Sequence, residues 1–102
     1  MKELTLPRKI KIGSNWYSVD VAETMKERVF MGEVNYATRT ITLARRAYHG
    51  TPLKLSALHE TFWHELTHAI LESMNRTELN NDENFVEEFS ARLAKAIQSA
   101  RF

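Results

Sequence analysis

Two histidines and a glutamate near the middle of the chain have the residue types and spacing of a metal-dependent hydrolytic site. Residues 58–74 read LHETFWHELTHAILESM, and residues 64–68 within them form an H-E-x-x-H sequence. On a helix, residues four apart lie one turn apart on the same face, so His64 and His68 can offer two imidazole nitrogens to one ion. Glu65 lies about 60° around the helix from His68 and can reach a water on that ion without being a ligand. This arrangement is typical of zinc hydrolases, so we predict Zn²⁺ as the cofactor.

The helix that must carry these residues is apolar on two sides. His64 and His68 lie opposite its main apolar stripe, yet Trp63 and Leu71 flank them. A helix that is apolar on both sides is normally buried between layers, where two histidines and an acid need partners that a metal supplies. The alternative is a surface helix with two solvated histidines. The stripe, at helical spacing, consists of Leu58, Phe62, Leu66, Ala69 and Ile70.

A catalytic zinc usually has three protein ligands and an open position, so the sequence must supply a third ligand. The chain contains no cysteine. Of the other two histidines, His59 lies roughly 140° around the helix from His64 and points elsewhere, and nothing favours His49. No histidine follows His68. A carboxylate of the last helix therefore remains, and the candidates are Glu83, Glu87 and Glu88.

The facing of the last helix favours one of these acids. Glu83 lies on one flank of the apolar stripe, Glu87 points further out on the same side, and Glu88 lies on the opposite flank. We therefore predict Glu83 as the third metal ligand and solvated positions for Glu87 and Glu88. Glu83 is equally explained as an acid at a helix start, where the macrodipole favours negative charge. The apolar face of this helix is predicted to comprise Val86, Phe89, Leu93, Ala96 and Ile97.

Length, composition and charge set the class of protein. A chain of 102 residues predicts one domain, residues 1–102, with 43% apolar and 26% charged residues, as in soluble globular proteins. The net charge of +1 gives no strong field toward nucleic acid or a membrane surface. The sequence contains no apolar run long enough to span a bilayer, and we expect no signal peptide, because residues 1–13 include no apolar core segment. We expect a cytoplasmic protein, with no nucleic-acid partner and no membrane association.

The remaining segments predict the scaffold. Four segments alternate polar and apolar residues, and turn residues join them in pairs, which indicates two hairpins. We therefore predict an α+β, zincin-like fold, in which an antiparallel sheet of three or four strands packs on two long helices. The first helix is predicted from Pro52 to Met74 with Thr51 as N-cap, and the second from Glu83 to Arg101 with Asp82 as N-cap. The strands are predicted over residues 9–12, 16–21, 29–37 and 40–43, and a loop over residues 75–81.

At this point the chain resembles a known family. The predicted strand pairs, HELTH on a helix, and an acidic helix with the pattern E-x-x-V-x-x-F-S from Glu83 resemble the small phage-type zinc metallopeptidases. These are similar to the ImmA/IrrE metallopeptidases, which belong with the gluzincins. The resemblance extends over LPRKIKIG, GEVNYATRTITLA and HELTHAILESM. In the ImmA/IrrE proteins the later helix resembles E-x-x-A-x-x-F-A with its first Glu as ligand, which falls on Glu83. Val86, Phe89 and Ser90 then take the Ala, Phe and Ala places.

The function predicted from these residues is peptide-bond hydrolysis by a metal-activated water, with Glu65 as general base. A peptide or protein substrate is expected to lie extended along a sheet edge, at the hairpin of residues 33–43. Glu72, one turn beyond His68, is a candidate acceptor that orients this imidazole. The candidates for stabilising the oxyanion are Tyr36, Tyr48 and His49.

Two other functions fit the same sequence. A phage or prophage binding module would keep zinc as a staple and act on a host protein without catalysis. Its contact residues would be Trp16, Tyr17 and Phe30, although burial in the core of a small sheet is the favoured interpretation of these aromatic residues. The second alternative is a protein without metal that dimerises through its pair of helices. An intact Glu65 favours the enzyme, because structural zinc needs no general base.

Overall fold

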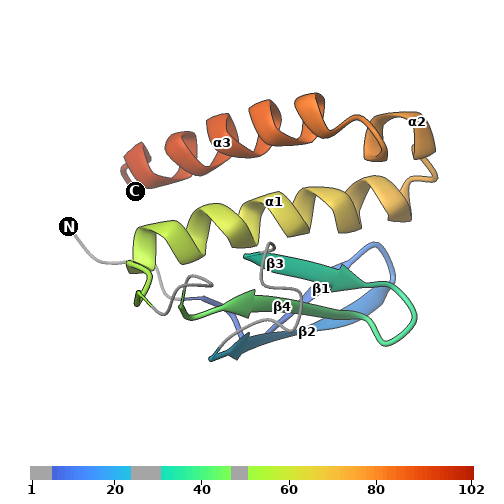
Figure 1. The fold of residues 1–102 in the computed structure, drawn as a ribbon. Helices are drawn as coiled ribbons and strands as arrows, with labels where there is room; N and C mark the ends of the chain where they lie inside the picture. Colours follow the sequence, from blue (N-terminus) through green and yellow to red (C-terminus); the bar gives the residue numbers. More distant parts are fainter. Residues whose placement is uncertain (1–5, 24–30, 47–50) are drawn as a thin grey trace.

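The chain forms three layers, with α1 lying between a sheet and α3 (Figure 1). The computed structural model describes residues 6–23, 31–46 and 51–102. The predicted α+β class, with four strands and two long helices, is confirmed within these residues. None of the helices there is both long and apolar enough to cross a lipid bilayer. The elements are β1 (Lys9–Ile12), β2 (Asn15–Ala22), β3 (Gly32–Asn35), β4 (Thr40–Ala44), α1 (Leu55–Ser73), α2 (Thr77–Asn80) and α3 (Glu83–Ser99).

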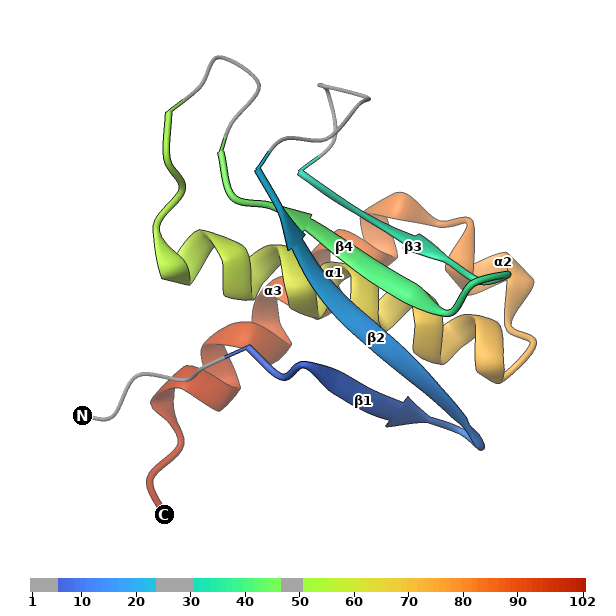
Figure 2. The same ribbon diagram turned by 90° about the horizontal axis from the view of Figure 1, so that it is seen from below.

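The sheet is mixed, so the prediction of a purely antiparallel sheet is wrong. Its strand order is β1-β2-β4-β3, which Figure 2 shows from the face opposite α1. Both predicted hairpins form, but β4 lies between β2 and β3 and pairs in parallel with β2. The physical reason is burial: Ile41 and Leu43 of β4 are fully buried, and the central place gives that strand neighbours on both sides.

The core lies between the inner face of the sheet and α1. Strand alternation buries Tyr17 at 4% exposure and leaves its neighbour Trp16 exposed at 55%, beneath the ammonium group of Lys9. Core packing, the favoured interpretation of both residues, is therefore right for Tyr17 and wrong for Trp16; Phe30 lies outside the described residues. Of the predicted stripe on α1, only Ile70 is exposed. The buried cluster comprises Ile12, Tyr17, Ile41, Leu43, Leu58, Phe62, Leu66 and Ala69.

The helix boundaries differ from the predictions at four places, and the smallest difference is the end of α1 at Ser73 rather than Met74. α1 begins at Leu55 rather than Pro52, and its N-cap is Lys54 rather than Thr51. Pro52 instead forms an isolated bridge with Arg46, which keeps this part of the chain extended. A short helix, α2, occupies part of the predicted loop. α3 ends at Ser99, two residues before the predicted end.

The start and the buried face of α3 explain how it approaches α1. The Asp82 side chain accepts a hydrogen bond from the Phe85 backbone N–H at 3.0 Å, so the predicted cap is confirmed. The predicted apolar face is partly wrong, because Phe89 is 48% exposed and stacks on Phe85. Of the predicted face, Val86 is confirmed as buried, and the other buried residues of α3 are Ser90 and Ala94. These smaller side chains, four residues apart, allow a close approach of the two helices.

Gly32 gives a test of how closely β3 approaches α1. A Cβ at this position would lie 2.6 Å from Thr61 Cγ2 and 3.2 Å from the Thr42 backbone oxygen. The Thr61 hydroxyl donates to the Ala57 carbonyl, which holds that methyl group in place. We expect Gly32→Ala to lower the free energy of unfolding by about 1–3 kcal/mol, measured by urea denaturation.

The control is the same change beside a smaller neighbour. Thr61→Ser removes the methyl group and keeps the hydroxyl, so the cost of Gly32→Ala should fall in that background. An equal cost in both backgrounds would show that Thr61 does not limit the approach of β3.

Candidate metal centre

His64 and His68 project from one side of α1 toward α3. They lie one turn apart, with ring centroids 5.0 Å apart and ring planes inclined by 68°. Both side chains are largely buried, at 21% and 13% exposure, because α3 covers this side of α1. His59 is buried as well, but it lies on another side of the helix, as expected. The predicted placement of the helix between two layers therefore describes the surroundings of both histidines.

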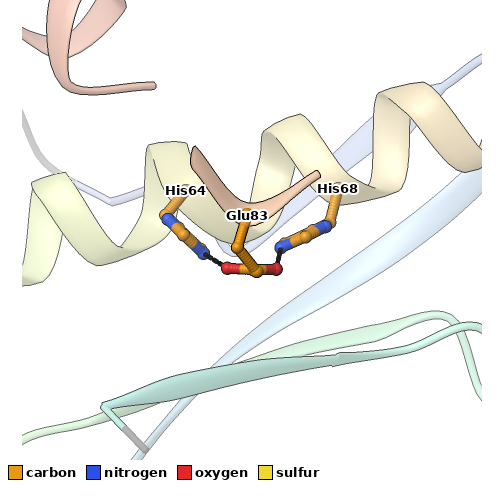
Figure 3. Close-up of side chains that lie close together, drawn as sticks. All are labelled: His64, His68 and Glu83. Carbon is orange, nitrogen blue, oxygen red and sulfur yellow. Dashed lines mark ion pairs between the residues drawn. The ribbon is translucent and has the colours of Figure 1, made fainter. Parts of the chain in front are cut away.

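Glu83 lies between the two imidazoles, in the first turn of α3 (Figure 3). Its Oε1 is 3.0 Å from His68 Nε2 and its Oε2 is 3.6 Å from His64 Nε2. One ligand atom from each of the three residues lies within 4.8 Å of the others, so the group can hold a metal ion. The structure thus brings together the three residues selected as ligands. Glu88 points elsewhere and is 4.0 Å from Arg92.

The two Nδ1 atoms also face oxygen atoms. His64 Nδ1 is 3.3 Å from Glu87 Oε2, and His68 Nδ1 is 2.6 Å from Asn80 Oδ1. Glu87 is 76% exposed, in keeping with the predicted solvated position, but it also contacts a candidate ligand, which the sequence did not suggest. Asn80, rather than the predicted Glu72, takes the place beside His68.

This arrangement of acceptors fits a divalent cation. A neutral imidazole carries a single N–H, and here each ring has an oxygen atom opposite both nitrogens. If both Nδ1 atoms donate, both Nε2 lone pairs face the Glu83 carboxylate, which is unfavourable unless positive charge lies between them. Two protons or one divalent ion provide that charge. His64, His68 and Glu83 are also the nitrogen and oxygen donors that zinc accepts.

Glu65 is the acid of the cluster that has the least contact with water. It is 9% exposed, and it accepts no hydrogen bond from any residue in the described ranges. Burial raises the pKa of this carboxyl to about 7; His68 lowers it, and Glu83 and Glu33 raise it further. A carboxyl with such a pKa can take up and release a proton near neutrality, as a general base must.

A pocket of about 510 Å³ opens beside this acid. It lies between the start of β3, the first half of α1 and the middle of α3, and both His64 and Glu65 line it. A molecule in the pocket therefore reaches a candidate ligand and the candidate base together. The other lining residues are Met31, Gly32, Glu60, Thr61, Glu87, Ser90, Ala91 and Lys95.

Tyr36 is the oxyanion candidate that the structure brings near the cluster. Its hydroxyl oxygen accepts a hydrogen bond of 3.2 Å from Asn80 Nδ2. Burial raises the pKa of Tyr36, and the acids Glu72, Glu65 and Glu83 raise it as well, against the lowering by Asn80. The phenol therefore keeps its proton at neutral pH. The other two candidates, at positions 48 and 49, lie outside the described residues.

No protein-family model, no curated protein and no solved structure matches this chain. The assignment of the centre therefore depends on its own geometry and donor set.

Substitution of the candidate ligands tests whether Glu83, rather than another acid of α3, binds the metal. We expect wild-type protein to bind about one equivalent of Zn²⁺ and His64→Ala to abolish binding, measured by calorimetric titration. Glu83→Gln should weaken binding by more than the 10–100-fold that loss of an indirect partner costs. Glu88→Gln is the matched control, since it removes an exposed acid of the same helix outside the cluster. Equal affinities of the Glu83 and Glu88 variants would refute the role of Glu83.

Proposed function

We propose that this protein is a zinc-dependent metallopeptidase of the zincin-like, gluzincin type, related to the ImmA/IrrE metallopeptidases that its sequence resembles. The observation that carries the proposal is the position of Glu65. It is a buried carboxyl that accepts no hydrogen bond from the described residues, and burial raises its pKa to about 7. It also lines a pocket beside the three residues that could hold a metal ion. A structural metal site needs no such acid.

Zinc is the ion that this donor set favours. Two imidazole nitrogens and one carboxylate match the two-histidine, one-glutamate ligand set of zinc peptidases, in which a fourth position stays open. When bound by His64, His68 and Glu83, the ion would supply Lewis acidity that polarises a peptide carbonyl and makes a water more acidic.

Glu65 then moves the proton in the reaction. It accepts a proton from the water whose oxygen attacks the carbonyl carbon of the peptide bond. The bond between carbon and nitrogen breaks, and Glu65 delivers the proton to the leaving amine. The products are a carboxylic acid and an amine, so one water is consumed and no oxidant or reductant is needed.

Tyr36 is the donor best placed to stabilise the oxyanion that forms during attack. Asn80 donates to its oxygen, so the proton of the hydroxyl group is left to point elsewhere. Burial and the charges of Glu72, Glu65 and Glu83 raise the pKa of the phenol, so it keeps the proton that it would donate. A hydrogen bond to a developing negative charge strengthens in the transition state, where it lowers the barrier.

The strand β3 offers a place for an extended peptide. It is an edge strand in the order β1-β2-β4-β3, whereas β4, the other strand of the predicted substrate hairpin, lies inside the sheet. Backbone groups on the free edge of β3 can pair with a substrate strand. Gly32 at its start lines the pocket beside Glu65, so a peptide along this edge would pass the candidate base.

Removal of the base tests the proposed chemistry. Glu65→Gln has nearly the same shape but cannot accept the proton, so kcat for peptide hydrolysis should fall by about 10²–10⁴-fold. The zinc content should stay at about one equivalent, because Glu65 is not a ligand; both quantities are measured on the same preparation. Full activity of this variant would contradict the role of Glu65. Zinc binding without hydrolysis in the wild type would favour the non-catalytic binding module.

Removal of the phenol tests the oxyanion donor. At saturating Zn²⁺, Tyr36→Phe should lower kcat by about 10²–10³-fold with a small change in KM, since the lost hydrogen bond to the substrate forms in the transition state. Steady-state kinetics on a quenched fluorescent peptide measure both constants. Tyr17→Phe is a control, because Tyr17 belongs to the core. An unchanged kcat in the Tyr36 variant would exclude this residue as the donor.

A further inference from the structure

The shortest contact between the cluster and its surroundings comes from α2. Asn80, the last residue of this helix, places Oδ1 2.6 Å from His68 Nδ1. We propose that Asn80 is a positioning residue that sets the tautomer and the ring orientation of His68, and that Tyr36 holds the Asn80 amide in place. This inference rests on the metal centre of the proposed function.

The role of Asn80 follows from the two nitrogens of one ring. An amide oxygen only accepts, so His68 Nδ1 must carry the proton that it donates to Asn80 Oδ1. The lone pair of Nε2 is then available on the side where Glu83 and His64 lie. If the proton moved to Nε2, this nitrogen would no longer be a ligand. The hydrogen bond therefore prepares His68 for metal binding.

The amide itself is held from its other end. Asn80 Nδ2 donates to the Tyr36 hydroxyl, which belongs to the turn between β3 and β4. Because Nδ2 is engaged there, Oδ1 is directed toward His68. A single side chain thus joins α2, the sheet and a candidate metal ligand on α1.

The corresponding contact of His64 is weaker. Glu87 Oε2 is 3.3 Å from His64 Nδ1 and its side chain is 76% exposed, whereas Asn80 is partly buried and 2.6 Å from His68. Water can replace an exposed acceptor more readily than a buried one. We therefore assign the larger effect on metal affinity to Asn80.

The turn after α1 fixes the position of Asn80. Asn75 adopts a left-handed conformation with φ of 57°, and the Arg76 backbone N–H donates to the Leu71 carbonyl at 3.0 Å. These features reverse the chain at the end of α1, and α2 follows at once. The end of α2 is thereby returned to the level of His68.

The experiment compares zinc affinities by competition with a chromogenic chelator. Asn80→Leu keeps a similar volume without an acceptor and should weaken Zn²⁺ binding by about 10–100-fold. Asn80→Asp keeps the acceptor and should bind within about threefold of the wild type or more tightly. Asn81→Leu is the matched control, since this neighbouring side chain is exposed, and its affinity should be unchanged.

A spectroscopic measurement distinguishes positioning from a general effect on packing. In zinc-loaded protein, the ¹H–¹⁵N spectrum of the imidazoles should show a slowly exchanging proton on His68 Nδ1. This signal should be lost in Asn80→Leu and retained in Asn80→Asp and Asn81→Leu. If Asn80→Leu fails to fold by circular dichroism, Asn80→Ala carries the same expectation.

Two outcomes would overturn the inference. One is a zinc affinity of the Leu or Ala variant within twofold of the wild type; the other is an equal loss in the Leu and Asp variants, which would indicate packing alone. A different result would contradict the proposed peptidase activity while leaving the role of Asn80 intact. A wild type that binds zinc and depends on Asn80, but hydrolyses no peptide, would retain the positioning role and lose the enzyme.

Discussion

The contact of the Glu83 carboxylate with the Nε2 atoms of His64 and His68 is the interaction on which the rest of this structure depends. It joins the first turn of α3 to the middle of α1 and so fixes where the two helices cross. The buried side chains of α3 then pack along the same line. The Glu83 side chain is 68% exposed, whereas both imidazoles are largely buried, and a divalent ion held by the three residues would balance the charge of the carboxylate beside them.

The two sides of α1 have different tasks. One side packs its apolar stripe on the sheet and stabilises the fold through burial. The other carries histidines that face α3, and Glu65 lies beside them at the pocket. The rigid packing on the sheet side holds the histidines in place, because both sets of residues belong to one helix. Preorganisation of this kind is what a metal centre requires of its scaffold.

Local patterns predicted most of this arrangement. The spacing of His64 and His68 and the apolar stripe of α1 depend only on helical geometry, and the facing of α3 was enough to select Glu83. The parallel pairing of β2 with β4 was missed, because alternation within a strand does not encode which distant strand becomes its neighbour. Asn80 was missed for a related reason. The tight turn at Asn75 directs it to His68, and the polar residues 75–81 suggested only a loop.

The candidate ligands and Asn80 all lie within residues 64–83, whereas β1 to β4 precede them and contribute Tyr36 and the pocket edge. A short helical hairpin therefore contains all three candidate protein ligands of the ion. Closing a loop of this length costs little chain entropy, so these helices can meet before the distant strands find their places. An ion captured at that stage would act as a nucleus for assembly, and the concentration of metal in the surroundings would then influence how fast the chain reaches its native state as well as how tightly it stays there.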